Sequence, residues 1–121
     1  MPFLDRNNLQ GSIPPEVTAL STLRDFDVNF NYNIGGSLPP GMGKLTLLKR
    51  LALSSNEISG TIPSELCGLQ SLEQLFVGYN QLMGEIPACW GNLTNLQSLF
   101  VRTFSGLSRC VGSCQVPQRF A

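Results

Sequence analysis

The stretch LKRLALSSNEISGTIP, residues 48–63, is followed 24 positions later by LEQLFVGYNQLMGEIP, residues 72–87. Both place aliphatic residues at the same strand-like positions, then an asparagine, a glycine and an Ile-Pro pair. A period of about 20–50 residues is typical of solenoids, in which each repeat is one coil stacked on its neighbours. These two stretches therefore predict a stacked-coil fold.

The same frame extends in both directions from this pair. Upstream, it recurs in residues 23–39 and in part in residues 4–14, while downstream it stops at Phe104, which stands where the asparagine belongs. We therefore divide the chain into repeats, residues 1–104, and an irregular tail, residues 105–121. The repeats comprise partial coil 1 (1–19), full coils 2 (20–44), 3 (45–68) and 4 (69–92), and partial coil 5 (93–104).

Each recurring residue type has a structural role. The alternation in Leu51-Ala52-Leu53 predicts a short strand with one face inward, and equal strands from successive coils would stack as a parallel sheet. The asparagine amide can satisfy backbone groups at the inward turn that follows. The glycine and proline suit a returning segment rather than a sheet. The expected asparagine ladder is Asn7, Asn31, Asn56 and Asn80, and Phe104 predicts a different fifth turn.

The unit L-x-x-L-x-L-x-x-N-x-L-x-G-x-I-P-x-x-L-G-x resembles the plant-specific class of leucine-rich repeat over residues 1–104. The resemblance implies a right-handed leucine-rich-repeat solenoid of the α/β-type repeat fold. It would have a concave parallel sheet of about five short strands, 3₁₀ or irregular convex segments, and little or no α-helix. Members of this class are mostly ectodomains of receptor-like kinases and receptor-like proteins, or inhibitors of cell-wall-degrading enzymes, and they bind peptides, steroids or proteins.

By this resemblance, the chain is expected to be a fragment of a receptor ectodomain that binds a protein or peptide. The alternatives are a small intracellular interaction scaffold and an inhibitor of a cell-wall-degrading enzyme. The family implies an extracellular or cell-surface location. The sequence shows no signal-length apolar start and no long apolar stretch, so no membrane insertion is expected and a cytoplasmic location stays open. Uncapped ends would invite self-association.

The binding surface is expected on the concave sheet, where outward positions alternate with the leucines. Aromatic residues dominate two of its coils, and exposed aromatic side chains with neighbouring arginines are typical of interface hot spots. An equally open alternative is that Phe100 and Phe104 are covered by further coils or by the tail. The candidate ligand-binding residues are Asp27, Phe30, Arg50, Phe76, Tyr79, Phe100 and Arg102.

Charge and composition exclude several other functions. Eight basic and eight acidic residues leave no net charge, so no footprint for nucleic acid or an anionic membrane is present. The chain has no histidine, which removes the commonest general base and all histidine-based triads. We therefore expect a protein without catalytic, cofactor or metal residues.

Four cysteines and one sequon complete the candidate features. Cys67 and Cys89 lie in successive coils, at positions of the repeat that differ by two. If the backbone is extended there, the distance between them is at the limit for a disulfide, so we expect unpaired residues on the convex side. Cys110 and Cys114 lie in the tail, as either an unrelated segment or the remnant of a capping disulfide. Asn92 begins an Asn-Leu-Thr sequon and is a glycosylation candidate if the chain is secreted. The alternative is that the tripeptide is simply part of the repeat consensus.

Overall fold

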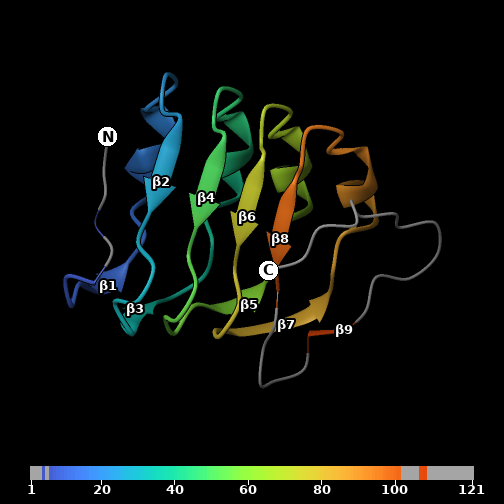
Figure 1. Cartoon of the computed structure of the whole chain (residues 1–121). Coiled ribbons are helices and arrows are strands. Elements are labelled where there is room, and N and C mark those ends of the chain that lie inside the picture. The colour runs from blue at the N-terminus through green and yellow to red at the C-terminus, as the bar shows by residue number, and fades with distance from the viewer. Residues whose placement is uncertain (1–3, 5, 102–106, 109–121) are drawn as a thin grey trace.

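The computed structural model describes residues 4, 6–101 and 107–108. They form a stack of coils in which a strand, a turn, a second short strand and a 3₁₀ helix recur in the same order (Figure 1). Along the chain the elements are β1 (Gln10–Ser12), η1 (Pro15–Ala19), β2 (Asp25–Asp27), β3 (Asn33–Gly35), η2 (Pro40–Lys44), β4 (Arg50–Ala52), β5 (Ser59–Thr61), η3 (Ser64–Gly68), β6 (Gln74–Phe76), β7 (Gln81–Glu85), η4 (Ala88–Asn92), β8 (Ser98–Phe100) and β9 (Leu107–Ser108).

The predicted parallel sheet is confirmed. Strands β2, β4, β6 and β8 lie side by side in that order, one from each of coils 2 to 5 (Figure 1). Their register follows the repeat, since Leu51 pairs with Phe26, 25 positions before it, and with Leu75, 24 positions after it. The backbone N–H groups of Leu4 and Arg6 extend the ladder into coil 1, each donating over 2.9 Å to a carbonyl of coil 2.

The core lies between this sheet and the 3₁₀ helices, as the solenoid prediction requires. Each strand buries its leucine positions, and each 3₁₀ helix buries one large side chain: Val17, Met42, Leu66 or Trp90. The indole of Trp90 is fully buried where other coils hold a smaller aliphatic side chain. No α-helix occurs in residues 6–101, in agreement with the predicted fold class.

A second set of strands runs along the turn edge of the stack, which the sequence did not predict (Figure 1). Strands β1 and β3 form one parallel pair, and β5, β7 and β9 form another sheet. The glycine of each coil takes a positive φ, as at Gly60 (φ 80°), and lets the chain turn while it stays paired. Each strand ends before the Pro of its coil, so the missing proline N–H disturbs no ladder bond. Strand β9 falls inside the segment expected to be an irregular tail.

The ladder asparagines join neighbouring coils through their amide groups. Nδ2 of Asn31 donates to Val28 of its own coil (2.7 Å) and to Leu4 of the preceding one (3.0 Å). Nδ2 of Asn80 likewise donates to Val77 (3.2 Å) and Leu53 (2.8 Å). Asn31, Asn56 and Asn80 are buried, whereas Asn7 is exposed.

One position of this ladder is incomplete. Oδ1 of Asn80 accepts the N–H of Ile58 over 2.9 Å, but Oδ1 of Asn56 has no partner among the described residues. Coil 2 contains one extra residue, because Pro39 follows Asn31 by eight positions while Pro63 follows Asn56 by seven. The extra residue moves the amide that would reach Asn56, and at the same junction β3 and β5 belong to different sheets.

Cys67 and Cys89 form a disulfide that links η3 to η4, with their Cα atoms 5.9 Å apart. The expectation that they stay unpaired was wrong, because it assumed an extended backbone. A 3₁₀ segment rises only about 2 Å per residue against about 3.3 Å in a strand, so an offset of two positions is about 4 Å. The pair then falls within disulfide range. Cys110 and Cys114 lie outside the described residues, as do Phe104 and its predicted turn.

Candidate functional site

The candidate residues gather on the outer face of the four-stranded sheet, on the side away from the 3₁₀ helices. A shallow pocket of about 380 Å³ opens there, hereafter the sheet-face pocket. Five of the seven predicted binding residues line it, and all five are half-buried. Its lining consists of Phe30, Arg50, Phe76, Tyr79 and Phe100 together with Asn29, Ser54 and Ser55.

A recurring backbone turn fixes the direction of several of these side chains. Phe30, Ser55 and Tyr79 each stand directly before a ladder asparagine, with φ of 59°, 59° and 55°. The left-handed conformation costs a non-glycine residue about 1–2 kcal/mol. The asparagine amides bond the carbonyl groups around this turn and thereby hold it. The ladder therefore positions the aromatic groups on the sheet face.

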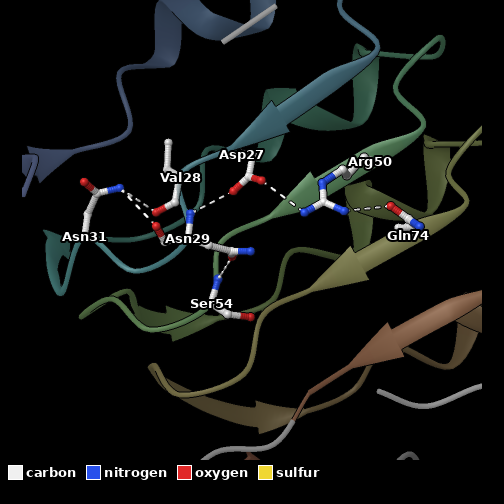
Figure 2. A network of polar contacts seen from close by, with 7 residues as sticks. All are labelled: Asp27, Val28, Asn29, Asn31, Arg50, Ser54 and Gln74. Atoms are coloured by element: carbon white, nitrogen blue, oxygen red, sulfur yellow. Dashed lines mark hydrogen bonds and ion pairs between the residues drawn. The ribbon is translucent and has the colours of Figure 1, made fainter. Parts of the chain in front are cut away.

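Arg50 is held at the rim of the pocket by a polar network that crosses three strands (Figure 2). Its Nη2 lies 3.0 Å from Oδ2 of Asp27, and its Nη1 donates to Oε1 of Gln74 over 2.9 Å. The guanidinium also lies 5.2 Å from the ring centroid of Phe76. These contacts fix the arginine before any partner arrives, while its Nε has no partner among the described residues.

Asp27, predicted as an outward ligand contact, is 6% exposed. One carboxylate oxygen faces Arg50, and the other accepts the N–H of Asn29 over 3.0 Å (Figure 2). Both oxygens therefore act within the protein, and Asp27 serves to position the arginine. The strand alternation gave the correct side of the sheet, but it could not show that the arginine of the next coil closes over the carboxylate.

Two pairs of aromatic rings extend along the sheet face. Tyr79 and Phe100 pack with ring centroids 5.4 Å apart at 55°. Phe30 contacts Tyr32 at 6.4 Å, and the Arg6 guanidinium lies 4.7 Å from the Phe30 centroid. Tyr32 is 62% exposed and was not among the predicted residues. The signal that could have found it is the extra residue of coil 2, which places an additional side chain in this turn.

Ser54 supplies an unpaired polar atom at the floor of the pocket. The residue is 5% exposed, and its Oγ has no hydrogen-bond partner among the described residues. Its backbone N–H donates to Oδ1 of Asn29 over 2.7 Å, so its own position is fixed (Figure 2). Ser54 follows Leu53, so the strand alternation also puts it on the outward face, although it was not among the predicted binding residues.

The other candidate features lie elsewhere. Arg102 falls outside the described residues. Asn92 is exposed at the end of η4, and the 3₁₀ helices lie behind the four-stranded sheet (Figure 1). The described segments contain no helix with the length and apolarity that a bilayer crossing requires. Within the same segments, no cluster of three or more His, Cys, Asp or Glu residues has a metal-binding arrangement.

Comparisons with known proteins agree with this architecture. The family model described as leucine rich repeat matches residues 21–82. The leucine-rich-repeat ectodomain of the receptor kinase SOBIR1 from Arabidopsis thaliana is 26% identical, with a TM-score of 0.80 over 96% of this chain and 65% of that one. The plant peptide hormone receptor RGFR1 in complex with RGF2 is 31% identical, with a TM-score of 0.74 over 84% of this chain and 16% of that one.

A similar structure with another role is a plant ice-binding protein, 34% identical, with a TM-score of 0.76 over 82% of this chain and 32% of that one. The chain thus spans less than two thirds of each of these three relatives. Receptor ectodomains and an ice-binding protein share the same coil, so the fold alone does not fix a function. The family match covers about half of the sequence and, with these structures, places the chain in the leucine-rich repeat family.

Proposed function

We propose that the chain is a recognition module that binds a peptide or protein through the sheet-face pocket, as part of the ectodomain of a receptor-like protein or receptor kinase. The observation that carries the proposal is the convergence of half-buried aromatic side chains from three coils on one pocket beside a fixed arginine. Rigid aromatic and arginine side chains in such a setting are the usual anchors of binding energy. The similar peptide hormone receptor supports this ligand class.

The size of the surface favours a peptide segment over a broad protein interface. Four strands at about 4.8 Å spacing span about 14 Å across the sheet, and each is only about 10 Å long. A stable protein interface needs about 800 Å² from each partner, which is several times this area. The alternative partner, a cell-wall-degrading enzyme, would need contacts well beyond the pocket.

The chemistry of the pocket favours binding over catalysis. Arg50 and Asp27 neutralise each other, and the remaining lining residues have aromatic, hydroxyl or amide side chains. None of these groups is arranged as a general base next to a nucleophile. The chain is accordingly proposed to bind without transforming its ligand, and to bind neither nucleic acid nor a cofactor.

The cysteine pairing favours the extracellular location over the intracellular scaffold. Disulfides persist in oxidising compartments and are rare in the cytosol. The bridge between Cys67 and Cys89 therefore supports a cell-surface or secreted protein, in which the exposed Asn92 is a candidate for glycosylation.

A random peptide library displayed on phage and selected against the full chain tests the proposal. We expect enriched peptides to lose about 30-fold or more in affinity for the double variant Phe76→Ala/Tyr79→Ala, since hot-spot residues contribute about 2 kcal/mol or more. Leu47→Ala removes an exposed apolar side chain outside the pocket and serves as the matched control. Selected peptides that bind the double variant as tightly as the native chain would contradict the proposal.

A further inference from the structure

Coil 3 leaves a gap in the aromatic surface. After Arg50, its outward residues Ala52, Ser54 and Ser55 are all small, whereas coil 2 presents Phe30 and coil 4 presents Tyr79 in the same turn position as Ser55. We call this gap the coil-3 slot. Ala52 is fully buried and Ser54 is 5% exposed, so Ser55 is the most accessible of the three residues.

The width of the slot follows from the strand spacing. Phe30 and Tyr79 belong to coils two strands apart, which separates their backbones by about 9.6 Å. A ring placed midway would lie about 4.8 Å from each wall, and aromatic pairs favour centroid distances of about 4.5–7 Å. One aromatic layer fits between these walls, and two layers do not.

The floor of the slot requires a polar group from the occupant. Ser54 Oγ is buried without a partner among the described residues, and a hydroxyl can both donate and accept a hydrogen bond. A buried polar atom without a partner is unfavourable, so an occupant that bonds to it gains affinity. A purely aliphatic occupant would leave it unsatisfied.

The charge distribution on the floor of the slot gives an ionised occupant little advantage. The guanidinium of Arg50 is already paired with Asp27 and Gln74, so it offers no unopposed positive charge. Lys49 and Glu73, 3.7 Å apart, are paired with each other near the same strands. A charged ligand group would therefore lose hydration in the slot without a matching partner.

We propose that the coil-3 slot binds one uncharged aromatic side chain that bears a hydrogen-bonding group, as tyrosine or tryptophan does. The ring packs between Phe30 and Tyr79, and its polar tip bonds to Ser54 Oγ. This inference rests on the proposed function and names the anchor residue that a peptide partner would carry.

The test uses the full chain labelled with nitrogen-15 and titrated with N-acetyl-tyrosinamide, while amide chemical shifts are followed. We expect saturable shifts at Ser54, Ser55 and Tyr79, with an affinity about fivefold higher than for N-acetyl-phenylalaninamide, the change expected for one hydrogen bond. N-acetyl-leucinamide and the singly charged N-acetyl-glutamic acid α-amide should leave these amides unchanged. If N-acetyl-leucinamide or N-acetyl-glutamic acid α-amide binds at the same amides as tightly as N-acetyl-tyrosinamide, the proposal is overturned.

Two variants separate packing from hydrogen bonding. Ser55→Phe fills the slot, and its backbone can accept a phenylalanine because Phe30 has the same φ of 59°. It should weaken tyrosinamide binding at least tenfold. Ser54→Ala should abolish the preference for tyrosinamide over phenylalaninamide while both still bind. Ser21→Phe, at an exposed position outside the pocket, is the matched control, and unchanged amide shifts away from the mutated residue verify the fold of each variant.

The two proposals fail in different ways. If library peptides lose binding to Phe76→Ala/Tyr79→Ala but carry no enriched aromatic residue and tolerate Ser55→Phe, the slot inference is wrong and the proposed function stands. If tyrosinamide occupies the slot but no library peptide binds the chain, the slot inference stands and the proposed function is wrong.

Discussion

The junction between coils 2 and 3 and the junction between coils 3 and 4 solve the same stacking problem with different contacts. In the first, beside the extra residue of coil 2, β3 and β5 belong to different sheets and are joined by two backbone hydrogen bonds, from Glu57 N–H to Ile34 O and from Ser59 N–H to Gly36 O, while Oδ1 of Asn56 has no partner among the described residues. In the second, β5 pairs with β7, and Asn80 both donates and accepts. The four-stranded sheet passes through both junctions in unbroken register.

The comparison shows that the two edges of a coil are determined separately. An insertion after the ladder asparagine changes the turn edge, because the added residue lies between the asparagine and the proline. It does not shift the strand residues of its own coil, since they precede that turn. A coil can therefore vary in length on one edge while the main sheet keeps its register.

The largest expected effect comes from the covalent link at the second junction. Replacing both cysteines, as Cys67→Ser/Cys89→Ser, should lower the free energy of unfolding by about 3 kcal/mol, because the bridge closes a segment with a sequence separation of 22. Urea unfolding of the full chain measures the change. A loss below about 1 kcal/mol would show that the second junction does not depend on its disulfide.

The first junction should respond instead to a change at Gly43, where η2 approaches η3. A Cβ added there would overlap the carbonyl oxygen of Glu65, so Gly43→Ala should cost about 2 kcal/mol through forced separation of the two helices. Gly35→Ala is the matched control, because its added Cβ would meet Glu57 O at 3.7 Å, an ordinary contact. Equal midpoints of thermal unfolding for the two variants would contradict the close-approach argument.

The smallest effect is the difference between two ladder positions. Asn80→Ala removes donated and accepted bonds, whereas Asn56→Ala removes donated bonds only. We expect Asn80→Ala to be the more destabilising by about 1 kcal/mol, the net contribution of one hydrogen bond. Chemical denaturation of both variants gives the difference. A larger loss for Asn56→Ala would mean that the extra residue of coil 2 does not weaken its junction.

The main sheet was predictable because its signals are local, whereas the 3₁₀ segments were expected from the resemblance to the leucine-rich repeat class. The alternation of leucines marks one face of a strand, and the period sets which strands are neighbours. From these two facts the sequence also placed Phe30, Phe76 and Tyr79 on one surface, as the structure has them.

The features that escaped prediction depend on geometry that no short stretch of sequence displays. The second set of strands contains glycine and borders proline, and both residues locally disfavour strands. These strands form only because they pair with the equivalent strands of neighbouring coils. The disulfide depends on the rise per residue in a 3₁₀ segment. The burial of Asp27 depends on the conformation that Arg50 adopts from the neighbouring strand.

The turn position before each ladder asparagine has a consequence for engineering. Its backbone has nearly the same φ in four coils, yet it carries a guanidinium, a phenyl ring, a hydroxyl and a phenol in succession, at Arg6, Phe30, Ser55 and Tyr79. The backbone cost of the conformation is similar for these side chains, so their chemistry can change without repacking the core. Randomising this column, with the asparagines left intact, would create a combinatorial library of new binding specificities on one unchanged scaffold.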